Sequence, residues 1–183
     1  MIQDSDLLLI LQMELAVCVT DKERGEHLFM KKIKICFTAS SGGHYEQLMM
    51  LKPLMEKYDS FIVTEKTLYN ATVEGKKTYY LMQVNRKEKL FFFYMIINMF
   101  KSIGIFLKER PNVVISTGVL STIPLCLLAK LFRKKFIFIE SFAKVTSATV
   151  TGKLMYKFAD QFYVQWESMK EVYPKSIYLG GIY

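Results

Sequence analysis

At 183 residues the chain is long enough to bury the core of one ordinary domain, but too short for two full α/β domains of about 100 to 200 residues each. The hydrophobic fraction of 51%, including 14% aromatic residues, excludes a disordered chain and predicts more apolar surface than a typical soluble domain shows. The three cysteines are odd in number and lie far apart in apolar runs. We therefore expect a reducing cytoplasm, with no disulfide framework, metal site or cofactor.

The net charge of +8 is unevenly distributed. Residues 1–29 hold six acidic and two basic residues, a net charge of −4, so residues 30–183 carry +12. The apolar run near the N-terminus is interrupted by polar residues and resembles neither a signal peptide nor a membrane span. We expect residues 1–29 to be an extension, either an appended segment or an accessory helix, and residues 30–183 to form one domain.

From Met30 onward, β-rich runs alternate with helical patterns. The predicted strands are residues 33–38, 60–64, 78–82, 112–116, 136–140 and 161–165. The predicted helices are residues 44–57, 88–109, 121–132, 151–159 and 166–172. This alternation predicts an α/β fold with a Rossmann-like, mainly parallel sheet and helices on both faces. Because ligands bind beyond the carboxyl ends of such strands, we look for a site in the loops after the first, fourth and fifth strands.

The first of these loops reads SSGGH and ends at His44. Its two glycines let the backbone approach a ligand, and the N–H groups of the following helix favour an anion such as a diphosphate. We predict phosphate or acceptor contacts from Ser41, Gly42 and Gly43. His44 can donate to a phosphate or act as a general base. A tight turn with a solvated histidine is the alternative, and the sequence alone leaves both open.

The other two loops add hydroxyl groups and a carboxylate. Thr117 and Gly118 precede a helix and can aim hydroxyl and N–H groups at a ligand, although ordinary helix capping explains them equally well. Glu140 ends a buried apolar run at the expected ligand edge, and a buried charge needs partners. It can bind sugar hydroxyls, with Ser141 and Lys144 nearby for polar or phosphate contacts. Alternatively, it pairs with Lys144 or contacts the N-terminus of a helix.

Residues 90–107 form an apolar stretch with a single charge, Lys101, and basic residues at both ends. A membrane span needs about 20 apolar residues, and polar residues interrupt this stretch. We therefore expect a helix that lies in the membrane interface. The residues predicted to contact the membrane are Phe92, Phe93, Ile97 and Phe100. The alternative is a helix wholly buried against the sheet, which would normally show one polar face.

Five segments, taken in their order and spacing, resemble one protein family. They are SSGGHYEQL, ISTG, IFIESFAKVTSATVTGKLMYKFAD, FYVQWE and YLGGIY. Together they resemble bacterial capsule and exopolysaccharide proteins of the PssD type, described as galactosyltransferase enhancers. Relatives of that family include the membrane-anchoring subunit of the two-chain enzyme that adds the second N-acetylglucosamine to dolichol-linked carriers. The resemblance implies the N-terminal half of a GT-B glycosyltransferase, similar to the acceptor-side domain of MurG.

The resemblance also implies a function. The chain would be the acceptor-binding subunit of a two-chain glycosyltransferase at the cytoplasmic face of the membrane, peripheral to it. It would activate a partner chain that carries the nucleotide-sugar site, and it would bind a polyprenyl-diphosphate-linked saccharide. His44 would lie near the acceptor phosphate or the reacting hydroxyl. We expect activity only with the partner chain.

Two other functions are alternatives to this one. A free-standing glycosyltransferase using a nucleotide sugar is the first alternative, and it is disfavoured because no second α/β half follows Tyr183. A basic nucleic-acid-binding module is the second. It is disfavoured because the cations are scattered and the main aromatic cluster is nearly uncharged, unlike a base-stacking platform. We therefore expect no nucleic-acid partner.

Overall fold

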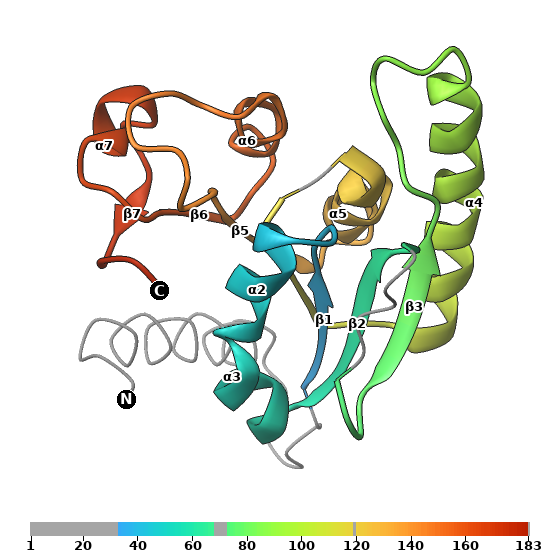
Figure 1. The fold of residues 1–183 in the computed structure, drawn as a ribbon. Coiled ribbons are helices and arrows are strands. Elements are labelled where there is room, and N and C mark those ends of the chain that lie inside the picture. The colour runs from blue at the N-terminus through green and yellow to red at the C-terminus, as the bar shows by residue number, and fades with distance from the viewer. Residues whose placement is uncertain (1–32, 68–72, 119, 183) are drawn as a thin grey trace.

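The computed structural model describes residues 33–67, 73–118 and 120–182, which form seven strands and several helices (Figure 1). The strands are β1 (Lys34–Thr38), β2 (Asp59–Glu65), β3 (Lys77–Leu81), β4 (Val113–Ser116), β5 (Lys135–Ile139), β6 (Gln161–Val164) and β7 (Ile177–Tyr178). The α-helices are α2 (Gly43–Met49), α3 (Lys52–Lys57), α4 (Phe91–Glu109), α5 (Ile123–Leu131), α6 (Val150–Met155) and α7 (Met169–Val172). The predicted extension, residues 1–29, lies outside the described residues.

The strands form one sheet in the order β3-β2-β1-β4-β5-β6-β7, and every pair of neighbours is parallel. The predicted Rossmann-like α/β fold is therefore confirmed. From β1 the chain builds outward to β2 and β3, and then returns to place β4 on the other side of β1. Ligands of such sheets bind where the strand order reverses in this way, which here is the carboxyl edge between β1 and β4.

Helices cover both faces of the sheet, as predicted. Alternate residues of β1 point to opposite faces, so Ile35 and Phe37 join the core cluster under α2 and α3, whereas Cys36 joins the cluster under α4 and α5. Figure 1 shows α2 and α3 on the near side of the sheet and α4 beside the edge strand β3. The central strands β1, β4 and β5 consist mainly of consecutive apolar residues, many of them β-branched or aromatic. Neither face of these strands meets solvent.

The clearest differences from the predicted elements are one helix that is divided and one additional strand. The helix expected over residues 44–57 is two helices, α2 and α3, with a break at Met50 and Leu51. Pro53 explains the break, because it has no N–H group to continue the hydrogen bonds of α2 and is favoured in the first turn of a new helix. The two-residue strand β7 was not predicted, since it is too short to show an alternating pattern.

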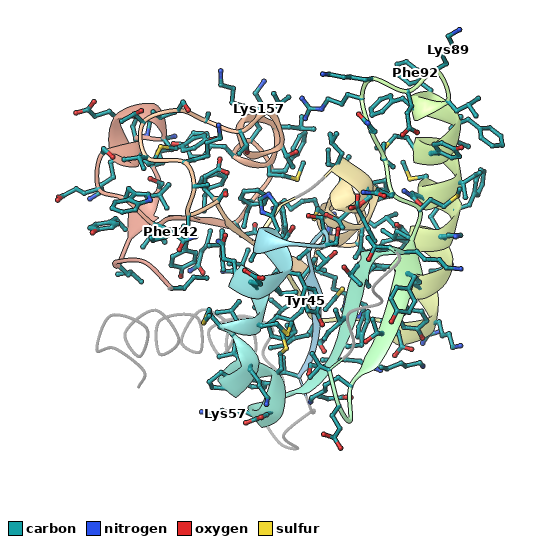
Figure 2. The ribbon with its side chains drawn as sticks, in the orientation of Figure 1. Tyr45, Lys57, Lys89, Phe92, Phe142 and Lys157 are labelled. Carbon is teal, nitrogen blue, oxygen red and sulfur yellow. The ribbon has the colours of Figure 1, made fainter. Side chains whose placement is uncertain are left out.

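Helix α4 has its polarity reversed with respect to an ordinary surface helix. Its polar residues Asn98 and Ser102 are fully buried, whereas Phe92 is 77% exposed and Phe100 is 70% exposed. The Asn98 side chain donates to the carbonyl of Met82 and accepts from its N–H group, both at 2.8 Å, which fixes the polar side of the helix to the end of β3. Figure 2 shows Phe92 with Lys89 at the N-terminal end of this helix, away from the sheet. The wholly buried alternative is therefore wrong.

A charged cluster closes the opposite, amino edge of the sheet. Glu109, at the end of α4, is 7% exposed and accepts hydrogen bonds from Lys34 Nζ at 2.6 Å, Lys77 Nζ at 2.5 Å and the Tyr79 hydroxyl. Burial raises the pKa of the Glu109 carboxyl, but these three donors outweigh it and lower the pKa from 4.5 to about 2. The cluster joins the last turn of α4 to the first residues of β1 and β3.

This cluster predicts how stability depends on pH. Because the pKa of Glu109 is lower in the folded chain, its stabilising effect is complete above pH 4.5 and is lost as the pH falls toward 2. We expect Glu109→Gln to lower the free energy of unfolding by about 2 kcal/mol at pH 7, and by much less near pH 2. Chemical denaturation at the two pH values measures this difference. An equal loss at both would show that the carboxylate charge does not stabilise the fold.

Candidate functional site

An open pocket of about 290 Å³ lies at the carboxyl edge of the sheet, where the strand order reverses. Its lining comes from the last residue of β2 and from the segments that follow β1, β3, β4 and β5. The lining residues are Ser40, His44, Glu65, Val84, Arg86, Gly118, Leu120, Glu140, Thr149 and Thr151. Three of these, His44, Gly118 and Glu140, were predicted from the sequence, and the structure brings them together from three loops.

His44 is held in place by reciprocal contacts with Thr117. The ring Nδ1 lies 2.8 Å from the Thr117 carbonyl oxygen, and the Thr117 hydroxyl donates to the His44 carbonyl at 2.8 Å. A carbonyl oxygen can only accept, so Nδ1 carries a proton. When the ring is neutral, Nε2 is then the basic nitrogen, and among the described residues it has no hydrogen-bond partner. The second residue of α2 thus presents an oriented base to the pocket.

Gly118 has no side chain and so leaves space for the His44 ring. Its φ of +115° lies in the region that favours glycine. A Cβ atom at this position would stand 3.3 Å from Cε1 of His44, closer than ordinary side-chain contacts allow. A larger residue would strain the backbone and push the ring away, so the loop after β4 sets the position of His44.

The Glu140 carboxylate is almost completely engaged by the protein. It accepts from the Ser141 N–H at 2.9 Å, from the Thr149 hydroxyl at 2.9 and 3.1 Å, and from the Tyr173 hydroxyl at 2.7 Å. Burial and the contact with Glu140 raise the pKa of Tyr173, which therefore stays protonated and donates. A carboxylate offers about four acceptor positions, so three donors leave it little capacity for a ligand.

Glu140 also organises the loops around it. Its backbone carbonyl accepts from Gln47 Nε2 at 3.1 Å and from Gln165 Nε2 at 2.8 Å. Thr149, which donates to the Glu140 carboxylate, also accepts from the Gly152 N–H at 2.7 Å and so caps helix α6. The residue at 152 must be small, because a Cβ there would lie 1.8 Å from Oε2 of Glu140. The contact is thus with the start of a helix rather than with Lys144, which makes no ion pair with Glu140 in the described chain.

Glu65, which sequence reasoning missed, is the second carboxylate of the pocket. It is the last residue of β2 and is 6% exposed. Burial raises its pKa, and the backbone of Val84 and the Ser121 hydroxyl only partly oppose this rise. The Ser121 oxygen is itself buried without a hydrogen bond of ordinary geometry among the described residues. No cation within the described ranges forms an ion pair with Glu65, so this carboxylate is far less engaged than Glu140.

Arg86 adds a positive charge to the same pocket. It lies in the connection between β3 and α4, is exposed, and forms no ion pair within the part of the chain that the structure describes. A guanidinium group in this state can bind phosphate through paired N–H donors. The pocket therefore combines an oriented imidazole, an available carboxylate and an available cation. These groups suit a ligand that carries both hydroxyl and phosphate groups.

The remaining predicted site residues lie beside the pocket rather than in its lining. Thr117 holds His44, and Ser141 donates its N–H group to Glu140. Gly42 caps α2 with a φ of +74°, and Lys144 closes a backbone turn onto the Ser141 carbonyl. Ser41 is half-buried and Gly43 begins α2. Across residues 33–67, 73–118 and 120–182, no cluster of three or more His, Cys, Asp or Glu side chains can hold a metal ion.

Comparison with known proteins places this pocket in a family context. A family model described as "Oligosaccharide biosynthesis protein Alg14 like" matches residues 35–182. UDP-N-acetylglucosamine transferase subunit ALG14 of Mus musculus is 27% identical, covering 83% of this chain and 84% of its own length. The protein of the same name from Yarrowia lipolytica is 26% identical, covering 98% of this chain and 96% of its own length. These relatives are eukaryotic, so the narrower resemblance to bacterial capsule proteins stays a prediction.

Solved structures share the fold at low sequence identity. MurG of Acinetobacter baumannii has a TM-score of 0.60 at 14% identity and matches 74% of this chain. UDP-GlcNAc 2-epimerase of Neisseria meningitidis, bound to UDP-GlcNAc, has a TM-score of 0.62 at 12% identity and matches 82% of this chain. The chain spans 42% and 47% of those two proteins, less than half of each. Since the family model matches most of the residues that form the sheet and the pocket, the chain belongs to the Alg14-like family of oligosaccharide biosynthesis proteins.

Proposed function

We propose that this chain is the acceptor-binding subunit of a two-chain glycosyltransferase that adds a sugar to a lipid-linked saccharide. The partner chain carries the nucleotide-sugar site, and this chain activates it. The observation that carries the proposal is the family match over residues 35–182, because the relatives are named as transferase subunits and the chain covers most of their length. The likeness to about one half of MurG supports a role as one half of a two-part enzyme.

The chemistry of the pocket supports an acceptor with a diphosphate and a sugar. Arg86 can bind the diphosphate of a polyprenyl-diphosphate-linked saccharide. The predicted contacts from Ser41, Gly42, Gly43 and Lys144 remain part of this proposal. Nε2 of His44 takes the proton of the attacking hydroxyl, while Thr117 keeps the opposite nitrogen protonated. Groups that stabilise the departing nucleotide diphosphate would come from the partner chain.

The exposed side of α4 supports attachment to a membrane, and the cytoplasmic face is part of the proposal. This helix is long and apolar enough to span a bilayer by length and composition, and only 22% of its apolar stretch is buried. Lysines flank it at both ends, which favours anionic headgroups. Since the hydrogen bonds of Asn98 hold the side of α4 that also buries Ser102 against the protein, the opposite side can lie in the interface. The bacterial capsule or exopolysaccharide setting belongs to the proposal and rests on the motif resemblance alone.

The first test separates a subunit from a free-standing enzyme. We expect the purified chain alone to transfer no sugar from UDP-N-acetylglucosamine to a polyprenyl-diphosphate-linked saccharide, and the co-purified partner chain to restore transfer. Radiolabelled sugar in the lipid fraction measures both reactions. Turnover by the lone chain at the rate of the complex would make it a free-standing glycosyltransferase and would reject the two-chain proposal.

The second test concerns His44 in the complex with the partner. His44→Ala removes the oriented base, so we expect transfer to fall roughly 100-fold or more, within the usual range for acid–base groups. Thermal unfolding and partner pull-down serve as controls, and both should match the parent. Full transfer by a well-folded His44→Ala complex would reduce the SSGGH loop to a structural turn and would place the base on the partner chain.

The third test concerns the membrane. Replacing Phe92, Phe93 and Phe100 by Ser removes three exposed aromatic side chains, so we expect binding to liposomes containing anionic lipid to fall at least about 10-fold. Ile97, the fourth predicted membrane contact, is half-buried, so it is left unchanged. The matched control is Met50→Ser, which changes an exposed apolar residue just after α2, the helix on the other face of the sheet. Sedimentation with liposomes measures binding, and parental binding by the folded triple variant would rule out this surface.

A further inference from the structure

The pocket contains two buried carboxylates in very different states. Glu140 accepts from three donors within the protein, and replacing it by an apolar residue would leave those donors unpaired. Glu65 lies in the same pocket and is also buried, but it has only the Ser121 hydroxyl and the Val84 backbone to oppose the effect of burial. An acidic group held in this state destabilises the free protein, and burial of such a group is usually associated with a function.

We infer that Glu65 is the carboxylate that contacts the acceptor saccharide, accepting hydrogen bonds from its hydroxyl groups, whereas Glu140 is a positioning residue. The inference rests on the proposed function of the chain as an acceptor-binding subunit. It adds a specificity-determining residue to that function. It also changes the role of Glu140, which the sequence suggested as the sugar-binding group.

The position of Glu65 relative to Arg86 decides which part of the acceptor it meets. A carboxylate repels phosphate and favours the hydroxyl groups of a sugar, whereas a guanidinium group binds phosphate. Glu65 ends β2 and Arg86 follows β3, so the two adjacent strands supply groups of opposite charge to one pocket. Among the described residues these two groups form no ion pair with each other. The diphosphate then lies toward Arg86 and the sugar toward Glu65.

A structural role for Glu65 would predict a different stability. If Glu65 supported the fold as Glu140 does, its replacement by Gln would lower the melting temperature. Because the pKa of Glu65 is raised by burial, ionisation of this group instead disfavours the folded state as the pH rises above its ordinary value. Glu65→Gln should therefore leave the melting temperature unchanged or raise it at pH 7, with a smaller gain at pH 4. Glu140→Gln should lower it.

The binding test uses the full chain and two kinds of short-chain polyprenyl diphosphate. One is bare, and the other carries N-acetylglucosamine, glucose or galactose in separate titrations. Calorimetry should show that the parent binds at least one glycosylated lipid about 10-fold or more tightly than the bare lipid. Glu65→Gln should lose about 10-fold, and Glu65→Ala up to about 100-fold, in affinity for the preferred glycosylated lipid, with no loss for the bare one. Glu46→Gln, an exposed carboxylate on α2, is the matched control and should bind both lipids as the parent does.

Each other outcome overturns a specific statement. If folded Glu65 variants keep the parental preference for the sugar, or if the parent has no such preference, Glu65 does not contact the acceptor and the inference is wrong while the proposed function stands. If the variants bind normally but lose transfer, Glu65 acts on the reaction and not on binding, which also rejects the inference. If the parent binds neither kind of lipid, the acceptor-binding function itself fails, and the role of Glu65 fails with it.

Discussion

The buried carboxylate of Glu140 is the constraint on which the loops of the pocket depend. A carboxylate at the end of a buried strand must be supplied with donors, since an unpaired buried charge would cost several kcal/mol. The chain supplies them by folding the segment after β5 back so that Thr149 and the start of α6 reach the carboxylate, and by bringing Tyr173 from the end of α7. The Glu140 carbonyl holds Gln47 of α2 and Gln165 after β6. Segments distant in the sequence therefore meet at one edge.

Three glutamates at the edges of the sheet show how environment sets the role of a side chain. Glu109 at the amino edge has three donors and a lowered pKa, and it stabilises the fold. Glu140 at the carboxyl edge is similarly paired and holds the pocket walls. Glu65, on the neighbouring side of the pocket, is buried with little support and has a raised pKa. The structure of the free chain explains the first two, whereas the third is the one that we assign to contact with a ligand.

The sequence predicts most of the fold and part of the pocket, for identifiable reasons. Apolar runs separated by helical patterns predict six of the seven strands, and they place His44, Gly118 and Glu140 after strands whose ends meet. Glu65 ends an apolar run in the same way as Glu140, so extending the predicted second strand by one residue would have found it. Arg86 lies in a loop without any pattern that points to a site. Thr149 and Thr151 line the pocket because the tertiary fold packs the start of α6 against Glu140, which no local sequence pattern indicates.

The central claim, that this pocket holds the saccharide end of a lipid-linked acceptor, is tested most directly by photoaffinity labelling. A polyprenyl-diphosphate-linked sugar with a diazirine on the sugar would be bound to the full chain on anionic liposomes and irradiated, and the labelled peptides would be identified by mass spectrometry. We expect labelling within residues 60–67, 82–88 and 140–152, and its loss when unlabelled acceptor is added in excess. Labelling confined to other segments, or labelling that excess acceptor does not reduce, would contradict the claim.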